Sequence, residues 1–282
     1  MILTIGTAQF GLKYGLKKKK INNKEINKIK KIIEKNNINY LDTSTNYGDS
    51  EKRIGKLKIK NKKIITKILL PKKILNIEKW YNDTIEKSLT DLKVKSLYGL
   101  LIHDTANILQ KNKKLLKLIM DSKKKKLVSK IGISVYEIKE VEKILKFWKP
   151  DIIQFPVNIF DQRFLQKKYL KKIKKFKIEL HARSCFLQGI LLSSKLKIGN
   201  KKSKQLFYDF INWCKVNRND QLTSCLHFIK QIKHIDSLVV GFDDANQLSE
   251  IISAYKKKTV KVPFKFSNND RKLIDPRKWV FN

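Results

Sequence analysis

Apolar and polar positions alternate along the chain in a repeating order. Eight short runs rich in isoleucine, leucine and valine recur, and between them lie stretches with an apolar residue every three or four positions, such as 23–37 and 136–148. The first pattern is typical of buried β-strands, and the second is typical of helices with one buried face. The predicted strands are 2–7, 38–43, 63–68, 98–103, 130–134, 151–155, 178–184 and 236–242.

This alternation predicts a parallel sheet, because strands separated by helices pair in parallel. Eight such units fit a single-domain α/β fold, the (β/α)8 TIM barrel, whose usual length is about 250 residues. We therefore expect one domain over residues 1–282, with two helices at 203–217 and 221–233 and a C-terminal tail over 259–282. An open doubly wound sheet is the alternative, but the turn GTAQFG after the first strand lacks the G-x-G-x-x-G spacing of a dinucleotide-binding turn.

The formal net charge of +39 raises the question of a nucleic-acid partner. Only six of the 64 basic residues are arginine, and the other 58 are lysines spread along the whole chain. Lysine, asparagine and isoleucine are all abundant and all have A/T-rich codons, so the base composition of the gene accounts for the excess. We expect no nucleic-acid partner, although the charge should attract small anionic ligands.

Other features of the composition indicate an ordinary globular protein. The hydrophobic content is 41%, no apolar run approaches the roughly 20 residues that span a bilayer, and the N-terminus does not read as a signal peptide. Three cysteines without a close pair point neither to disulfides nor to a metal site. We expect a soluble cytoplasmic protein with no metal and no membrane partner, and the sequence gives no indication of its oligomeric state.

Polar residues stand at the ends of five consecutive predicted strands. They are Asp42, Lys67, His103, Ser134 and Gln154, with Asn158 just beyond the last. Each alone has an ordinary explanation, such as a helix cap, a solvated lysine or a buried histidine. In a TIM barrel, however, the C-terminal ends of the strands form one face, and that face carries the active site. Taken together, these residues predict a single polar cleft.

Several segments, in order along the chain, resemble the aldo-keto reductase family. YLDTSTNYGDSEKRIG (40–55) resembles the family signature, and IITKI and LLIHD resemble its lysine and histidine strands. IGISVY, IIQFPVN, RSCFLQGILL and LVVGFDDANQL resemble its later strand ends, so the matches run from residue 3 to about residue 252. The resemblance implies a barrel that reduces a small carbonyl compound with a nicotinamide dinucleotide, bound without a Rossmann domain.

The side chains of the first three segments suit such a reaction. Carbonyl reduction needs a hydride at carbon and a proton at oxygen, and Tyr47 is a suitable proton donor whose ordinary pKa is about 10. A cation at Lys67 should lower that pKa. Asp42 can hold the lysine, and His103 can donate to the carbonyl oxygen. The hydride has to come from a cofactor, since no side chain supplies one. We expect these four residues to be catalytic.

The resemblance also implies a set of binding residues. Those expected at the cofactor are Gly6, Thr7, Ser134, Gln154, Arg183, Ser184, Gly241 and Gln247, and Asn158 is expected at the substrate. The chain departs from the family pattern at Val135, where many members have asparagine, and at Arg183, where many have tyrosine. A guanidinium can stack on a ring or reach a phosphate.

The loop after the eighth strand bears on the choice of cofactor. Family members that prefer a 2′-phosphate usually have basic residues here, whereas this chain has Asp243 and Asp244. The two acids either repel a 2′-phosphate or cap the following helix. The preference that prevails in the family leads us to expect NADP(H) rather than NAD(H).

Two other functions compete with reduction. One is a non-reductive barrel that keeps a cofactor site and regulates a partner, as potassium-channel β-subunits do. The other is a lysine-rich nucleic-acid binder. The intact set of Asp42, Tyr47, Lys67 and His103 favours a reductase, while the identity of the carbonyl substrate is not readable from the loops that would form its pocket.

Overall fold

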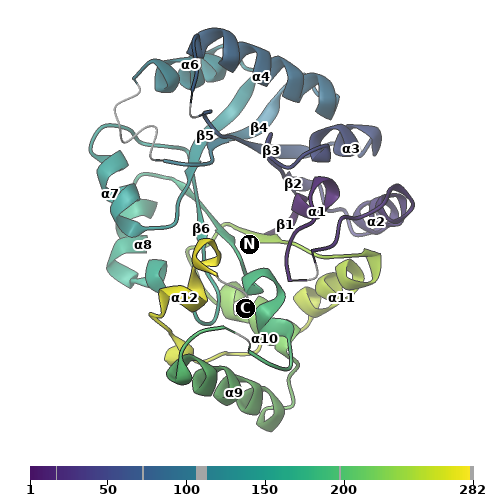
Figure 1. The fold of residues 1–282 in the computed structure, drawn as a ribbon, viewed down its shortest axis with the longest axis vertical. Helices are drawn as coiled ribbons and strands as arrows, with labels where there is room; N and C mark the ends of the chain where they lie inside the picture. The colour runs from purple at the N-terminus through teal and green to yellow at the C-terminus, as the bar shows by residue number, and fades with distance from the viewer. Residues whose placement is uncertain (17, 72, 106–112, 197, 280–282) are drawn as a thin grey trace.

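Eight parallel strands close into a barrel in the computed structural model, with each strand paired to the next along the chain and β8 paired to β1. The structure describes residues 1–282 except 17, 72, 106–112, 197 and 280–282. The strands are β1 Ile2–Gly6, β2 Tyr40–Asp42, β3 Lys63–Ile68, β4 Leu97–Ile102, β5 Val128–Ser134, β6 Ile152–Pro156, β7 Glu179–Arg183 and β8 Ser237–Val240. The predicted (β/α)8 fold is confirmed (Figure 1).

Helices between the strands form the outer layer of the barrel (Figure 1). The described helices are α1 Ala8–Gly11, α2 Asn23–Lys35, α3 Ser50–Lys56, α4 Ile77–Leu92, α6 Lys113–Lys124, α7 Ile138–Leu145, α8 Lys167–Lys174, α9 Lys201–Val216, α10 Gln221–Lys230, α11 Ala245–Lys256 and α12 Arg271–Ile274. Both α9 and α10 lie in the interval before β8, close to the predicted ranges. Asparagine side chains cap α2, α4 and α9, since Asn22, Asn76 and Asn200 each accept a backbone N–H of the first turn.

The hydrophobic core has two layers, as a closed barrel requires. Outside the sheet, the apolar faces of the helices pack on the strands; in α2, for example, Ile26, Ile29 and Ile33 are buried, and Ile32 is partly buried against them. Inside the sheet, a small cluster of Ile65, Leu101 and Ile152 fills the barrel. The interior is therefore packed with side chains and is not a channel.

Polar groups close the N-terminal end of the barrel. The hydroxyl of Tyr98 donates to Glu179 at 2.9 Å, and the Lys130 ammonium pairs with the same carboxylate. His181 contacts Glu179 as well, with Nε2 at 3.3 Å from Oε2. These charges pair with one another, so we assign this end of the barrel to stability and look for chemistry at the other end.

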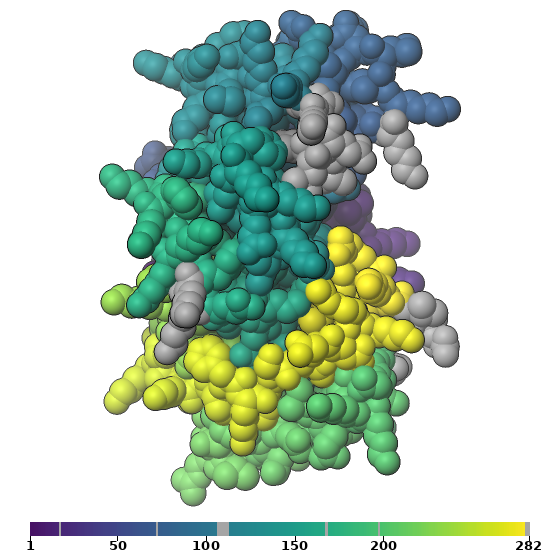
Figure 2. Space-filling view, turned by 90° about the vertical axis from the view of Figure 1, so that its left-hand side faces the viewer, coloured from purple at the N-terminus to yellow at the C-terminus, as the bar shows by residue number. Residues whose placement is uncertain are grey.

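The C-terminal tail folds back on the barrel beside α7 and α9. It carries two single-turn segments, Phe264–Phe266 and Pro276–Lys278, on either side of α12. Arg271 donates to Glu137 at the start of α7 with Nη2 to Oε2 at 2.8 Å, and Phe266 is buried against α9. Figure 2 shows this yellow segment lying across the green and teal parts of the surface.

Within the described part of the chain, no helix combines the length and the apolar character needed to cross a membrane. The same residues contain no group of three or more His, Cys, Asp or Glu side chains that could hold a metal ion.

Candidate active site

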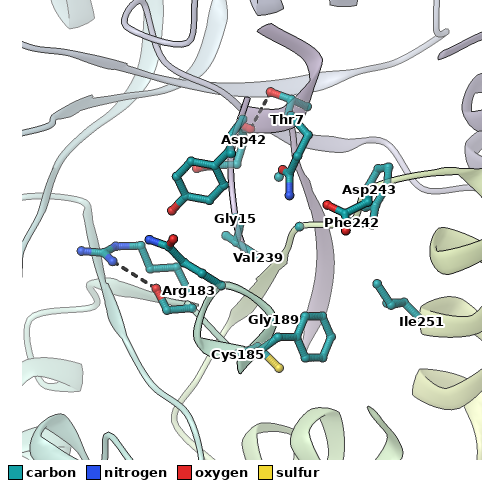
Figure 3. Close-up of a pocket in the computed structure, with 18 of the residues that line it drawn as sticks. Thr7, Gly15, Asp42, Arg183, Cys185, Gly189, Val239, Phe242, Asp243 and Ile251 are labelled. Carbon is teal, nitrogen blue, oxygen red and sulfur yellow. Dashed lines mark hydrogen bonds between the residues drawn. The ribbon is translucent and has the colours of Figure 1, made fainter. Parts of the chain in front are cut away.

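A cavity of about 770 Å³ lies at the C-terminal ends of the strands (Figure 3). This volume is within the range of about 300–1,000 Å³ typical of small-molecule sites. All eight strand ends contribute to its lining, including Gly6, Asp42, Lys67 and Ser134. The register explains why these residues meet, because Gly6 pairs with Asp42 across β1 and β2, and Ser134 pairs with Gln154 across β5 and β6.

Asp42 and Lys67 form a buried ion pair at the base of the cavity. The Lys67 side chain is 2% exposed and that of Asp42 is 5% exposed, and Nζ lies 2.5 Å from Oδ1. Lys67 also donates to the Thr43 carbonyl at 2.8 Å, and Gln154 Nε2 donates to Asp42 Oδ2 at 2.8 Å. Burial lowers the pKa of Lys67, while the hydrogen-bonded Asp42 acts in the opposite direction. The two charges therefore neutralise each other within the site.

Tyr47 lies in the loop after β2, next to both Lys67 and His103. The Lys67 Nζ is 5.3 Å from the Tyr47 ring centroid, and the Tyr47 and His103 rings meet edge to face at 5.9 Å. Burial raises the pKa of the Tyr47 phenol, and the Asp42 carboxylate raises it further. The phenol is thus protonated at neutral pH and can donate a proton.

The sequence led us to expect that Lys67 lowers the Tyr47 pKa, and the structure differs on this point. Burial dominates, and the cation that opposes it is Arg183. The ammonium of Lys67 is hydrogen-bonded to Asp42, so at the phenol the attraction of the cation is offset by the repulsion of the anion.

His103 follows β4 directly and is neutral in this setting. Burial lowers its pKa from 6.5 to about 3, and the charges of Lys67 and Arg183 act in the same direction. Its Nδ1 lies 3.2 Å from Ser44 Oγ. The Ser44 hydroxyl also donates to the Lys67 carbonyl at 3.0 Å, so its oxygen lies between that carbonyl and the imidazole. In the tautomer whose Nδ1 accepts from Ser44, the His103 Nε2 carries the hydrogen and can donate to a carbonyl oxygen.

All eight residues expected to contact the cofactor line the cavity. They are Gly6, Thr7, Ser134, Gln154, Arg183, Ser184, Gly241 and Gln247. Thr7 is fixed by a hydrogen bond from Oγ1 to the Asp42 carbonyl, at 2.9 Å (Figure 3). Gly6 is closely packed, since a Cβ at this position would lie 3.0 Å from the Val240 carbonyl oxygen. The wall of the cavity at β1 is therefore backbone rather than side chain.

Ser134 and Gln154, which the family resemblance places at the cofactor, already contact other protein groups. Ser134 Oγ lies 3.5 Å from Gln154 Oε1, while Gln154 Nε2 donates to Asp42. Val135 is buried in the core, and its side chain has no hydrogen-bonding group to replace the asparagine of other family members. The Ser134 hydroxyl and part of the Gln154 amide remain for a ligand. This set has fewer hydrogen-bond donors and acceptors than the set in family members with asparagine at the position of Val135.

Asn158 does not line the cavity in the described part of the chain. Its amide nitrogen donates to the Ser184 carbonyl at 3.1 Å, and its Oδ1 accepts the backbone N–H groups of Phe160 and Asp161. It thus fixes the loop that carries Ser184. A direct substrate contact by Asn158 stays a prediction that these hydrogen bonds do not support.

The two acids after β8 have different positions. Asp244 is the N-cap of α11, where its Oδ1 accepts the Gln247 N–H at 2.9 Å. Asp243 lines the cavity together with Gln247 and Glu250. The next backbone donor, Ala245 N–H, is held at 2.8 Å by Glu25 from α2. This contact lowers the pKa of Glu25. Carboxylates therefore lie around the start of α11, and two of them also pair with lysines outside the cavity lining, Asp244 with Lys19 at 3.5 Å and Glu25 with Lys28 at 3.4 Å.

Sequence reasoning did not assign a role to several lining residues. Tyr14, Tyr136, Gln188 and Glu250 all line the cavity. Tyr14 and Gln188 come from two loops that meet where the Leu16 N–H donates to the Gln188 carbonyl at 3.1 Å. Loops have no periodic pattern, so only the quoted motifs IGISVY and RSCFLQGILL could have drawn attention to Tyr136 and Gln188.

Comparison with known proteins identifies the fold and the family. No curated protein matches the sequence. Among solved structures, an aldo-keto reductase from Bacillus halodurans in its holo form is similar, with 16% identity, 92% of this chain and 88% of that chain covered, and a TM-score of 0.73. A glycerol dehydrogenase from Gluconobacter oxydans is also similar, with 16% identity, coverage of 92% and 87%, and a TM-score of 0.69.

At such low identity these structures support the fold alone. The sequence itself, however, matches the model of the aldo/keto reductase family over residues 2–265, which is nearly its whole length. The chain therefore belongs to the aldo/keto reductase family.

Proposed function

We propose that this protein reduces an aldehyde or ketone to an alcohol with NAD(P)H. Membership of the family implies nicotinamide-dependent oxidoreduction of a small molecule. The observation that carries the proposal for carbonyl reduction is the meeting of Asp42, Tyr47, Lys67 and His103 in one cavity. The three cysteines of the chain are buried and free, as in proteins of a reducing compartment. We therefore propose that the reaction takes place in the cytoplasm.

The cavity has the size and the groups that a nicotinamide dinucleotide needs. Its lining continues from the polar strand ends to α11, and Gly6 and Gly241 contribute backbone to it. Ser134 and Gln154 are the residues that would hold the carboxamide. When bound, the reduced nicotinamide would supply the hydride.

The protein's own residues would manage the proton. Tyr47 keeps its proton at neutral pH because burial raises its pKa, and it can release the proton to an oxygen that gains negative charge during reduction. His103, neutral and oriented by Ser44, can donate a hydrogen bond to the same oxygen. The Lys67–Asp42 pair lies under the Tyr47 ring and fixes the polar base of the site.

The experiment that tests this proposal has two steps. Fluorescence titration with NADH and with NADPH should show saturable binding of at least one of them. A panel of small aldehydes and ketones should then oxidise the bound cofactor in step with alcohol formation. Binding with no turnover of any carbonyl compound would instead favour a regulatory barrel.

We further propose that the cofactor is NAD(H), against the preference expected from the sequence. Asp243 and Glu250 line the α11 end of the cavity, and Lys67 and Arg183 are the only lysine or arginine among the described residues of its lining. The N–H groups that could bind a 2′-phosphate are also engaged, since Ala245 donates to Glu25 and Gln247 donates to Asp244. Carboxylates accept hydrogen bonds from free ribose hydroxyls and repel a phosphate.

A further inference from the structure

An arginine that has no acidic partner among the described residues lies at the reactive end of the cavity. Arg183 ends β7 and lines the cavity, with its guanidinium on the side away from Asp243 and Ile251 (Figure 3). Its Nη1 donates to Ser184 Oγ at 3.2 Å, and its Nη2 donates to the Val135 carbonyl at 3.1 Å. Both partners are neutral. Nε is buried and has no hydrogen-bond partner among the described residues.

Most other arginines of the chain are paired with carboxylates, which makes Arg183 unusual. The paired ones are Arg53, Arg163, Arg271 and Arg277. Burial raises the pKa of Asp161, and the main cation that opposes this is Arg163, which is bonded to both Asp161 oxygens at 2.7 Å; Arg183 adds only the weakest contribution. No described carboxylate is therefore left to neutralise the Arg183 guanidinium.

The guanidinium of Arg183 is held in a fixed orientation by an aromatic ring. Its central carbon lies 4.2 Å from the centroid of the Tyr136 ring, and the guanidinium carbon of Arg277 lies 3.7 Å from the same centroid. Tyr136 lines the cavity, whereas Arg277 does not. An arginine that is stacked and anchored in advance loses little entropy when it binds an anion.

The charges around Tyr47 leave this end of the cavity with a net positive charge. Lys67 and Asp42 neutralise each other, and His103 is uncharged because its pKa is about 3. Arg183 remains, and it is close enough to Tyr47 to oppose the burial that raises the phenol pKa. An anionic group bound here would lie beside the proton donor.

We propose that Arg183 binds a carboxylate of the substrate, so that the substrate is a small aldehyde or ketone carrying a carboxylate within a few carbons of its carbonyl group. This rests on the proposed reductase function. Two of the five guanidinium N–H donors are used by Ser184 and Val135, and the remaining donors suit one planar carboxylate. A dianionic phosphate would call for a second cation, and Lys67 is already paired.

The cofactor pyrophosphate is the other anion that Arg183 could meet. It lies in the middle of a dinucleotide, however, whereas Arg183 shares the reactive end with Tyr47 and His103, whose pKa values its charge lowers. We therefore assign the guanidinium to the substrate, and the experiment below includes cofactor binding as a separate arm.

The test compares charged and neutral forms of the same carbonyl compound. The probes are glyoxylate and succinic semialdehyde, each beside its methyl ester, and kcat/KM is measured for the wild type, Arg183→Gln and Arg277→Gln. We expect the wild type to prefer at least one acid over its ester by tenfold or more, as a charged hydrogen bond allows. Arg183→Gln should bring that ratio close to one. Arg277→Gln, which removes the other arginine from the Tyr136 ring, should keep it.

The outcomes separate this inference from the proposed function. Reduction of the esters at least as efficient as that of the acids by the wild type would overturn the role of Arg183 while leaving the reductase in place. No reduction of any probe or of a wider carbonyl panel would count against the reductase itself. Loss of NADH binding in Arg183→Gln, measured by fluorescence titration, with an unchanged acid-to-ester ratio would assign the arginine to the cofactor and overturn the inference.

Discussion

The two ends of the cavity carry opposite charge. At the strand ends near Tyr47, the Lys67–Asp42 pair is neutral, and Arg183 adds a cation that no carboxylate of the described residues pairs with. At the start of α11, Asp243 and Glu250 line the wall, with no lysine or arginine among the described lining residues of that end. Figure 3 shows Arg183 and Asp243 on opposite sides of the cavity.

This difference shows that the overall charge of +39 does not describe the site. Most lysines are exposed, and their fields are screened over about 8 Å at physiological salt. Local groups therefore decide what binds at each end. A ligand with an anionic group near its reacting carbon suits one end, and a ribose with free hydroxyls suits the other.

The largest expected effect comes from removing the proton donor at the reactive end. Tyr47→Phe should lower kcat for carbonyl reduction by about 10²–10⁴-fold, the usual contribution of general acid catalysis. Cofactor affinity should stay within about threefold, because Phe keeps the ring that meets His103. Stopped-flow reduction and fluorescence titration measure the two quantities. A variant with more than half of the wild-type rate would show that another group donates the proton.

The next effect concerns the neutrality of the Lys67–Asp42 pair. Lys67→Met leaves the Asp42 carboxylate buried with Gln154 as its one remaining side-chain partner, and breaking a buried pair typically costs about 3–5 kcal/mol of the free energy of unfolding. Urea unfolding at pH 7 measures this loss.

The matched control for that variant removes both charges. The double variant Asp42→Asn, Lys67→Met keeps side chains of similar size at both positions and leaves no unpaired ion. It should therefore be more stable than Lys67→Met alone. If the single and double variants were equally stable, the Asp42 carboxylate left by Lys67→Met would not be destabilising. The Lys67 ammonium would then not be needed to neutralise it.

The residues that the sequence predicted well are those fixed to strands. Asp42 ends β2, Lys67 is next to the end of β3, and Gln154 lies within β6 level with Ser134 at the end of β5, so the parallel register brings them to one face. The polarity of this face of the barrel was thus predictable without knowing any loop.

The residues that it did not predict reach the cavity or its rim from loops, helices and the tail. Glu25 bonds to Ala245 across 220 positions of the chain, and no local pattern encodes such a contact. Tyr14 comes from an irregular loop, and Arg277 reaches the Tyr136 ring from the tail. The sign of the charge at each end of the cavity depends on contacts between residues far apart in the sequence and on which acids already have hydrogen-bond partners. The pattern of residues along the chain does not contain this information.

A smaller effect is expected at the α11 end. Replacing Asp243 with Asn and Glu250 with Gln together should raise the affinity for NADPH relative to NADH by about tenfold, which equals about 1.4 kcal/mol, because two repulsive charges are removed. Glu34→Gln is the matched control, since it removes an acid from the outer side of α2 where Glu34 pairs with Lys30. An unchanged ratio of the two dissociation constants would place the adenosine away from these acids.

A pH-dependent effect tests whether Arg183 carries the only net charge at the reactive end. His103 has a pKa of about 3 in the folded protein, and the ordinary value is about 6.5. Between these values the unfolded chain binds a proton at His103 that the folded protein does not bind. The contribution of the neutral His103 to the free energy of unfolding is therefore fully present above pH 6.5 and decreases as the pH falls through that value. The slope from one such group is at most about 1.4 kcal/mol per pH unit, and partial exposure of the ring reduces it.

Comparison with His103→Gln isolates this contribution, since the variant lacks the group that titrates. Between pH 7 and pH 5 the wild type should lose more stability to acid than the variant does, as measured by urea unfolding at each pH. Over the same range kcat/KM should show no ionisation near pH 6.5, because the imidazole is already neutral there. An ionisation near pH 6.5 in the wild type that disappears in His103→Gln would mean that His103 becomes protonated in the active enzyme. The reactive end would then carry two cations, and the single-carboxylate assignment of Arg183 would have to include His103.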